Sequence, residues 1–361
     1  MFFVRTFILI PLSWFYRFVV FVRLKLYKWG ILRTHNLPVK VISVGNLSTG
    51  GTGKTPACIM LIRKFQLQGL KVAYLSRGYM RKTTGFVNVA PNSLAEEVGD
   101  EALLVKNRFP EIPVAVCEDR YQGGLRLVAE NKLDAIILDD AFQHVQLHRD
   151  LDFLVVDATT PPWKDKLLPI GRLREPYRNY KRSDLMFVTK INPDTERQFR
   201  TRIAIPKVYL KTKVTKLQHC FIPTKQMDNF ATERISCIVF SGLGNNQAFH
   251  NYLNSLNINV LKFYPFPDHH IFSAKQLKAI KEKFTRFSKQ TFFKVPPILI
   301  TTEKDYFRIK EKNYFCEIFG NQPIYYLKIE TEIESGEDYL NTELSKLFNL
   351  APSLDTVSLS V

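Results

Sequence analysis

The sequence predicts an α/β fold in which helices cover a doubly wound, mostly parallel sheet. From Pro38 onward, short and nearly continuous apolar runs alternate with helical stretches. Strands that are apolar on both faces are typical of parallel sheets, because helices cover both sides of such a sheet. A glycine-rich turn also connects the first apolar run to the helical stretch that follows it, as in a βα unit. The expected strands span residues 39–44, 72–75, 114–117, 135–138, 153–156, 185–188, 235–240, 260–264 and 298–301.

The glycine-rich turn ends in glycine, lysine and threonine at positions 53–55. Backbone amides of such a turn and of the following helix N-terminus cradle phosphates, which predicts a nucleotide site of the P-loop NTPase type. Lys54 would reach the β- and γ-phosphates, and the Thr55 hydroxyl would ligate Mg²⁺. The strict P-loop pattern has glycine in place of Ser48, so a plain βα turn with a surface lysine is the alternative. The expected cofactor-binding residues are Ser48, Thr49, Gly50, Gly51, Thr52, Gly53, Lys54 and Thr55.

Two carboxylates, Asp139 and Asp140, end the expected strand 135–138. Downstream of a phosphate-binding turn, a strand with this ending typically supplies the aspartate that is directed at Mg²⁺. Polar clusters follow several other expected strands, and ligands of open α/β sheets bind at these carboxyl ends. Arginines in such clusters offer cations to phosphate groups, and an aromatic or amide side chain can contact a sugar headgroup. The candidate substrate-binding residues are Tyr79, Arg120, Gln143 and Arg174.

Neither a zinc site nor a disulfide framework is indicated. The five cysteines include no Cys-x-x-Cys pair. The stretch Asp268-His269-His270 offers three possible ligands, but two adjacent histidines cannot easily share one ion and nothing nearby completes a set of four. A catalytic or substrate-contacting histidine is the favoured interpretation of this stretch.

The distribution of charge predicts a polyanionic partner. The net charge is +17, and residues 1–95 contain 14 Lys or Arg but no Asp or Glu. A field of one sign over a quarter of the chain suits nucleic acid, anionic lipid headgroups or a phosphorylated substrate. The sequence has no motif of a nucleic-acid-binding fold, so no nucleic-acid partner is expected.

Residues 1–30 are expected to form a membrane-associating helix. Two apolar runs, 7–16 and 18–22, are separated by Arg17, and basic residues follow at positions 23, 25 and 28. Each run is shorter than the roughly 20 residues that a bilayer span needs. Aromatic side chains beside Arg and Lys suit a helix that lies in the headgroup region, with its cations on anionic lipid. The basic residues scatter around the helical wheel, which leaves a buried hydrophobic helix as the alternative.

Composition divides the rest of the chain into four segments. A P-loop core domain is expected over residues 31–200 and a smaller α/β domain over 233–349. Between them, residues 201–232 are polar and basic without a long apolar run, which is typical of a linker. Residues 350–361 are expected to form a loose tail.

Eight stretches of the sequence, in order across almost the whole chain, resemble the tetraacyldisaccharide 4′-kinase family, the lipid A 4′-kinases of Gram-negative bacteria. Ser48 agrees with the loop of that family, whereas Met80 and Ala141 stand where the family has glycine; neither residue carries chemistry. The matching stretches are GNLSTGGTGKTP (45–56), LSRGYMRK (75–82), VGDE (98–101), DDAFQH (139–144), LPIGRLREP (168–176), FSGLGN (240–245), FPDHH (266–270) and TTEKD (301–305).

This resemblance implies a reaction and a location. The reaction is transfer of the γ-phosphate of ATP to the 4′-hydroxyl of a tetraacyldisaccharide 1-phosphate, an acylated glucosamine disaccharide, to form lipid IVA in lipid A biosynthesis. ATP and Mg²⁺ are the expected cofactors. The implied location is the cytoplasmic face of the bacterial inner membrane, with the membrane surface as a partner and no obligatory protein partner.

The resemblance also implies individual roles. Asp100 is expected to accept the proton of the attacking hydroxyl, paired with His269 in preference to His270. Such a pair would cross between the two expected domains, so that domain closure assembles the site. The candidate metal-binding residues are Thr55, Asp139, Asp140, Glu101 and Glu175.

The competing hypothesis is a membrane-associated P-loop NTPase that hydrolyses nucleotide as a switch and phosphorylates no lipid. The stretch Thr189-Lys190-Ile191-Asn192 is similar to the guanine-binding motif of GTPases, but Asn192 stands in place of the required Asp. This departure argues against a guanine site and against a GTPase-like switch.

Overall fold

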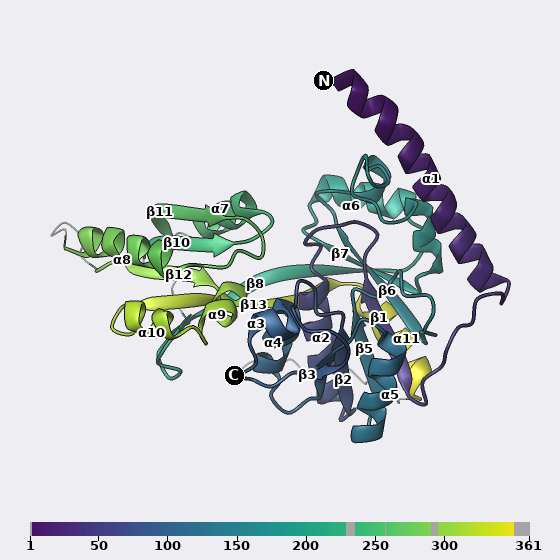
Figure 1. Cartoon of the computed structure of the whole chain (residues 1–361), viewed down its shortest axis with the longest axis horizontal. Helices are drawn as coiled ribbons and strands as arrows, with labels where there is room; N and C mark the ends of the chain where they lie inside the picture. Colours follow the sequence, from purple (N-terminus) through teal and green to yellow (C-terminus); the bar gives the residue numbers. More distant parts are fainter. Residues whose placement is uncertain (1, 229–234, 257, 290–294, 350–361) are drawn as a thin grey trace. The chain divides into compact units, whose positions relative to one another are not determined.

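The computed structural model describes residues 2–228, 235–256, 258–289 and 295–349 (Figure 1). The predicted tail, 350–361, lies outside the described residues. The chain forms two compact units. Unit 1 consists of the chain up to Arg77, Cys117–Thr212 and the chain from Thr331. Unit 2 consists of Gly78–Val116 and Lys213–Glu330.

This division differs from the predicted one in two places. Residues 78–116, expected in the P-loop domain, belong with the second α/β unit. The predicted linker, 201–232, contains strand β8 (Lys207–His219); residues 229–234 of that segment lie outside the described residues. Strand β8 buries the three consecutive residues 208–210 and exposes 211–213, which include two lysines, so its apolar runs are short. Runs of this length between basic residues carry little periodic signal for a strand.

Unit 1 contains a parallel sheet with β1 (Lys40–Gly45) inside it. Strand β5 pairs with one edge of β1 and strand β6 with the other, both in parallel. All residues of β5 and β6 are buried, as expected for strands with helices on both faces. The predicted parallel α/β architecture is confirmed (Figure 1). In spatial order the strands are β8, β7 (Leu185–Thr189), β6 (Leu151–Asp157), β1, β5 (Ala135–Asp139) and β2 (Val72–Ser76).

Helix α2 (Lys54–Leu67) follows β1 and buries six of its side chains, including Phe65. Helix α11 (Glu337–Phe348) packs on α2 although it lies near the end of the chain. The rings of Phe65 and Phe348 are 5.7 Å apart, and Lys64 forms a 2.6 Å ion pair with Glu337. The other helical elements of unit 1 are α1 (Phe2–Lys28), α5 (Arg120–Glu130), α6 (Pro193–Arg202) and the 3-10 helices η1 (Pro162–Lys164) and η2 (Tyr177–Arg182).

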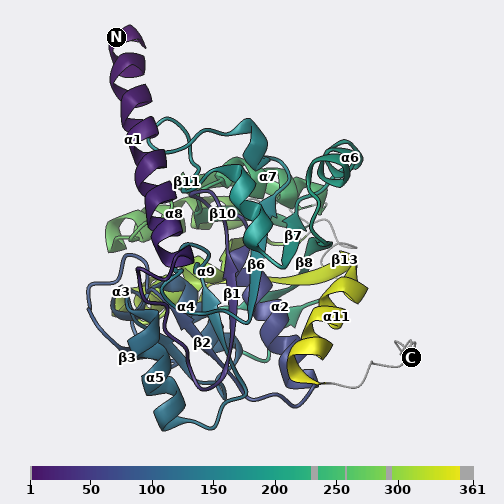
Figure 2. The same ribbon diagram turned by 90° about the vertical axis from the view of Figure 1, so that its right-hand side faces the viewer.

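Helix α1 exposes most of its apolar side chains, in contrast to the buried-helix alternative. Its amino-terminal half projects beyond the other elements of unit 1 (Figures 1 and 2). Among its described residues, the Ser13 hydroxyl donates to Leu167 O at 3.3 Å and the Tyr16 hydroxyl donates to Arg174 O at 2.8 Å, which attaches the helix to the rest of unit 1. Over the described part of the chain, no helix combines the length and apolarity that a bilayer crossing requires. The exposed apolar residues of α1 are Ile8, Ile10, Leu12, Trp14, Phe15, Phe18, Val19 and Phe21.

Unit 2 contains a second, smaller set of parallel strands, and a smaller α/β unit is what the sequence predicts. Strand β10 (Ser236–Gly242) lies between β11 and β12, and β12 pairs in parallel with β13. Phe240 from β10 packs in one core with Phe315 and Phe319. The remaining strands are β3 (Val87–Asn88), β4 (Val114–Val116), β9 (Gln226–Met227), β11 (Asn259–Phe266), β12 (Ile298–Thr302) and β13 (Ile324–Ser335). The helices are α3 (Ala95–Val98), α4 (Asp100–Arg108), α7 (Asn246–Ser255), α8 (Ala274–Ser288), α9 (Glu303–Ile309) and α10 (Asn313–Phe319).

A buried ion pair joins α4 to α9 inside unit 2. The guanidinium of Arg108 contacts the carboxylate of Glu303, and both side chains are almost fully buried. Arg108 also donates to Ile329 O at 2.7 Å. Helix α4 begins at Asp100, so this pair fixes the helix that carries the predicted catalytic aspartate.

Replacing Gly45 by alanine is expected to destabilise unit 1. The added Cβ would lie 2.5 Å from the backbone N of Phe142, so one of the two segments must shift. Overpacking of this kind costs about 1–3 kcal/mol. Urea denaturation followed by circular dichroism should show this loss in the free energy of unfolding, whereas Gly51→Ala, which adds a Cβ in open space, should change it by less than about 1 kcal/mol. Equal stability of the two variants would contradict the prediction.

Candidate active site

The loop between β1 and α2 is a tight turn whose shape depends on two glycines. Gly50 and Gly53 have φ of 111° and 96°, in the left-handed region where a side chain is strained. Inside the turn, Thr52 N donates to Gly50 O at 3.1 Å, and the buried Asn46 amide donates to the Thr52 hydroxyl at 3.0 Å. Helix α2 begins at Lys54. The turn thus brings backbone amides to a helix N-terminus, the arrangement that binds phosphate.

The stretch 168–176, which contains Arg172 and Arg174, lies directly against this turn. Thr49 N donates to Arg172 O at 2.8 Å, and Arg174 N donates to Leu47 O at 2.7 Å. The two loops are therefore paired through their backbones. This pairing holds the Arg174 side chain beside the residues that follow β5.

Asp139, at the end of β5, contacts the P-loop threonine. Its Oδ2 accepts hydrogen bonds from the Thr55 hydroxyl at 3.0 Å and from the Tyr74 hydroxyl at 2.6 Å. Hydroxyl and carboxylate oxygens are the hard donors that Mg²⁺ prefers, and water and substrate phosphates usually complete its shell. Within the described residues, no three or more His, Cys, Asp or Glu side chains gather into a metal site. Thr55 and Asp139 therefore fit a Mg²⁺ ion that is shared with nucleotide phosphates.

Asp140 lies between two cations of the same site. Its carboxylate is 3.5 Å from Lys54 Nζ, and Arg174 Nη1 donates to its two oxygens at 2.8 and 2.9 Å. Burial alone would raise the pKa of Asp140, but the charges of Lys54 and Arg174 outweigh burial and lower it. The aspartate is therefore ionised at neutral pH and balances two cations that a phosphate can also bind.

Arg120 and Gln143 belong to the same group. Arg120 is buried and donates to Cys117 O and Glu118 O, both at 3.1 Å. Burial lowers its pKa to about 10, against the opposing charge of Asp140. Gln143 Nε2 donates to Asn46 O at 2.8 Å, and Gln143 Oε1 accepts from Arg174 Nη1 at 3.4 Å. The structure thus gathers three of the four candidate substrate residues, Arg120, Gln143 and Arg174, around Asp140.

Glu175, a candidate metal ligand, has other partners. Its carboxylate, which is almost fully buried, accepts from Arg182 at 2.5 and 3.0 Å and from Asn179 at 2.7 Å. Arg182 in turn lies over the Phe142 ring, 4.0 Å from its centroid. These contacts give Glu175 a structural ion pair next to the residues that follow β5.

Asp100 forms a second charged cluster, in unit 2. His269 Nδ1 is 2.7 Å from Asp100 Oδ2, and Arg308 donates to both carboxylate oxygens, at 2.9 and 2.5 Å. Burial alone would raise the pKa of Asp100, but the hydrogen bonds from His269 and Arg308 and the nearby cations hold it well below its usual range. Asp100 is therefore a carboxylate at every pH near neutrality.

Of the two adjacent histidines, His269 contacts Asp100, as expected. His270 Nε2 is instead 3.1 Å from Gln276 Oε1. The candidate headgroup residue Tyr79 packs edge-on against the His269 ring, with centroids 5.3 Å apart. The expected crossing of this pair between two domains is not found, because Asp100 and His269 both belong to unit 2.

Glu101, the other candidate metal ligand, is paired with Lys304. Lys304 Nζ lies 2.8 Å from the Glu101 carboxylate and 3.8 Å from Asp100 Oδ2. Burial alone would lower the pKa of Lys304, but Glu101 and Asp100 raise it above its usual range. The lysine is therefore charged and neutralises part of the acidic cluster.

Sequence reasoning missed several residues that complete these two clusters. Tyr74 stands in an apolar strand and shows no signal of its own. Lys304 belongs to the charged TTEKD stretch at the end of an expected strand, so its position indicates a site residue. Arg308 lies four residues after Lys304, on the same face of α9, and this helical spacing indicates that both side chains contact one cluster.

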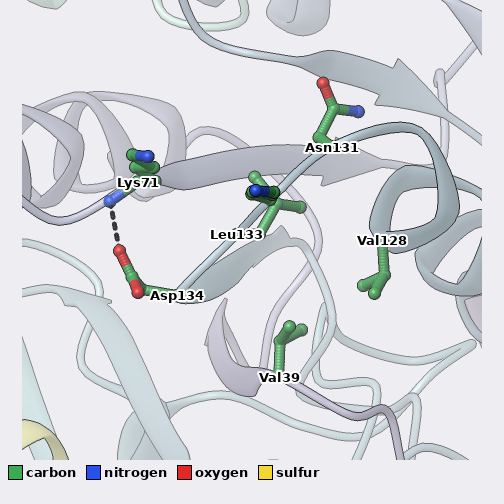
Figure 3. A pocket seen from close by; sticks show the side chains of 7 residues that line it. Val39, Lys71, Val128, Asn131, Leu133 and Asp134 are labelled. Carbon is green, nitrogen blue, oxygen red and sulfur yellow. Dashed lines mark hydrogen bonds between the residues drawn. The ribbon is translucent and has the colours of Figure 1, made fainter.

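A surface pocket of about 440 Å³ lies at the amino-terminal ends of the unit 1 strands (Figure 3). It is lined by Val39, Lys71 and Asp134, which precede β1, β2 and β5, and by residues of the α5 end. Lys71 N donates to the Asp134 carboxylate at 2.7 Å. Ligands of open α/β sheets bind at the carboxyl ends of the strands, so this pocket is not part of the site described above.

Comparisons with known proteins agree on one family. A family model described as tetraacyldisaccharide-1-P 4′-kinase matches residues 5–349. A tetraacyldisaccharide 4′-kinase of Chlorobaculum parvum is 34% identical over 351 residues, which cover 94% of each chain. That of Flavobacterium psychrophilum is 33% identical over 357 residues, which cover 96% of this chain and 97% of the relative.

A solved structure has the same fold. It is a crystal structure of an "apo" form of LpxK from Aquifex aeolicus in complex with ATP. The TM-score is 0.74 at 32% sequence identity, and the match covers 94% of this chain and 98% of that chain.

Asp100→Asn is expected to lower the free energy of unfolding by about 3 kcal/mol at pH 7, because Arg308 loses a buried ionic partner. The pKa of Asp100 is depressed in the folded state, so its stabilisation is complete above the unfolded value of about 3.9 and is lost as the pH falls further. Urea denaturation of wild type and variant should show a constant gap from about pH 7 to pH 5 and a smaller gap below about pH 4. A gap that widens between about pH 7 and pH 5 would contradict the sign of the pKa shift.

Proposed function

The chain belongs to the tetraacyldisaccharide-1-P 4′-kinase family, and from this membership we propose how its residues perform the reaction. The protein is an ATP-dependent kinase of lipid A biosynthesis. It transfers the γ-phosphate of ATP to the 4′-hydroxyl of a tetraacyldisaccharide 1-phosphate, which gives lipid IVA. The observation that supports our assignment of roles is the 3.0 Å contact of Thr55 with Asp139 beside Lys54.

In this proposal, unit 1 holds the nucleotide. The P-loop amides and Lys54 bind the β- and γ-phosphates. Thr55 and Asp139 would hold Mg²⁺, which would neutralise charge on the phosphates when bound. Without nucleotide, Asp140 orients the side chains of Lys54 and Arg174. When ATP binds, phosphate oxygens replace Asp140 as the partners of these two cations. Arg120 and Arg174 balance the charge that spreads over the transferred group.

Unit 2 supplies the group that accepts a proton. A sugar hydroxyl is a poor nucleophile at neutral pH, so a base within hydrogen-bond distance must take its proton during the attack. The Asp100–His269 pair has the composition and the 2.7 Å contact that this task requires. Tyr79, next to His269, and Gln143, in the nucleotide unit, are the proposed contacts of the sugar headgroup.

We also propose that α1 binds the membrane surface, at the cytoplasmic face of the bacterial inner membrane. A row of exposed aromatic and aliphatic side chains on one helix favours a lipid surface over water. Lys25 lies over the rings of Phe21 and Trp29 at 5.6 and 5.7 Å, where it can reach anionic headgroups. The lipid substrate resides in the same surface, so a helix that lies on the membrane keeps the enzyme near its substrate.

Transfer of γ-³²P from ATP to a detergent-dispersed tetraacyldisaccharide 1-phosphate tests the assigned roles. Lys54→Ala should abolish labelling of the lipid, because the γ-phosphate loses its main cationic partner. Asp100→Ala should lower kcat by about 10²–10⁴-fold with little change in the KM for ATP, as expected for loss of a general base. Label released only as inorganic phosphate by the wild type would contradict the kinase reaction and favour an NTPase switch.

Membrane binding by α1 can be tested with the full chain and vesicles that contain anionic phospholipid. Replacement of Trp14, Phe15 and Phe18 by glutamine should reduce co-sedimentation at least tenfold, since each buried apolar side chain contributes about 1.5–3 kcal/mol. The matched control is Leu67→Gln, which changes an 84% exposed leucine of α2. An equal vesicle-bound fraction in the triple variant and the control would refute the membrane role of α1.

A further inference from the structure

Met80 has a backbone conformation that glycine adopts more easily than any residue with a side chain. Its φ is 60°, in the left-handed region, where the Cβ of an L-residue lies too close to the following carbonyl oxygen. Met80 is the third residue of a turn that Arg81 closes, because Arg81 N donates to Gly78 O at 3.3 Å. Turns with a positive φ at the third residue usually have glycine there. Methionine at this position therefore costs folding free energy that glycine would not cost.

Contacts on both sides of Met80 fix this turn. A Cβ on Gly99, the N-cap of α4, would lie 3.2 Å from the carbonyl carbon of Gly78, so the turn packs directly against the start of that helix. After the turn, Lys82 N donates to Glu96 O at 2.7 Å. The surrounding structure thus holds Met80 in the left-handed conformation, next to the helix that carries the predicted catalytic aspartate.

The side chain of Met80 is exposed beside the proposed site of the acceptor sugar. Met80 is 64% exposed. The residue before it, Tyr79, packs edge-on against the His269 ring, with centroids 5.3 Å apart. A methionine side chain has no hydrogen-bond donor, and its flexible thioether adapts to apolar partners of irregular shape. Its chemistry therefore suits an alkyl group better than a sugar hydroxyl or a phosphate.

We propose that Met80 binds an acyl chain of the lipid substrate. The inference rests on the function proposed above, in which Tyr79 contacts the sugar headgroup. A tetraacyldisaccharide has four acyl chains on two sugar rings, so alkyl chains accompany the sugar that this tyrosine contacts. Strained residues persist where the surrounding structure holds them, and they cluster at ligand-binding sites. Among the described non-glycine residues of unit 2, the other one with a positive φ is His269, which belongs to the same site.

Three substitutions separate the apolar contact from the backbone strain. Met80→Gln keeps the length of the side chain but makes its end polar, Met80→Leu keeps it apolar, and Met80→Gly removes both the side chain and the strain. The matched control is Val295→Gln, which changes a 57% exposed valine of unit 2. Val295 precedes the amino-terminal end of β12, whereas His269 follows the carboxyl end of β11.

The experiment measures phosphorylation of tetraacyldisaccharide 1-phosphate by the full-length chain at a fixed detergent concentration. Met80→Gln and Met80→Gly should each raise the KM for the lipid at least about fivefold, because an apolar side chain is no longer buried against the acyl chain. The KM for ATP should stay within about twofold, and Met80→Leu and Val295→Gln should retain both values. A lipid KM in Met80→Gln equal to that of the wild type, or equal to that of Val295→Gln, would overturn the acyl-chain contact.

The stability of the same variants provides a second measurement. Met80→Gly should unfold at a higher urea concentration than Met80→Gln, because glycine adopts a φ of 60° without strain. A gain in stability together with weaker lipid binding is not expected of a side chain that serves the fold alone. If Met80→Gly were instead the less stable of the two, the side chain would serve the fold and the proposal would be wrong. Failure of the wild type to label the lipid would refute the proposed function, so the two failures are distinguishable.

Discussion

The parallel pairing of β1 with β5 is the constraint on which the nucleotide site depends. Val44 and Asp139 are partners in that register, so the P-loop and the two aspartates both lie at the carboxyl ends of their strands, on the same side of the sheet. In a parallel pair, carboxyl ends coincide by construction, and residues 84 positions apart, Thr55 and Asp139, come to 3.0 Å without a special loop. Antiparallel pairing would place the aspartates beside the amino-terminal end of β1, away from the P-loop.

In the clusters around Asp140 and Asp100, charged side chains are wholly or partly buried, and each is stabilised by oppositely charged partners. An isolated buried carboxylate or guanidinium is expensive, whereas a paired and hydrogen-bonded one is tolerated. In unit 1, Asp140 balances Lys54 and Arg174, and phosphate oxygens can replace this aspartate as their partner. In unit 2, Arg308 stays bound to Asp100 and Asp305 at once. The first cluster is thus suited to ligand exchange and the second to holding one geometry.

Helix α1 contacts the loop beside the nucleotide site through Tyr16. Tyr16 donates to the backbone of Arg174, whose side chain binds Asp140 and whose amide pairs with the P-loop segment. A helix with a series of exposed apolar side chains therefore contacts the loop that pairs with the P-loop segment. The residues that make this docking contact and the neighbouring one, Tyr16 and Ser13, are less exposed than Trp14 and Phe15, which belong to the proposed lipid-binding surface.

Features that depend on neighbours along the chain could be predicted from the sequence. The P-loop, the Asp139-Asp140 ending of β5, the alternation of strands and helices, and the apolar character of α1 are all local patterns, and the structure contains each of them. Contacts between distant segments could not be predicted: Arg308 pairs with Asp100 across 208 positions, Glu175 pairs with Arg182, and β8 stands where a linker was expected. Periodicity reports how a segment is buried, but it does not report which charged groups meet, because that depends on packing between distant elements. For the same reason, Asp100 and His269 were expected in two different domains, whereas both belong to unit 2.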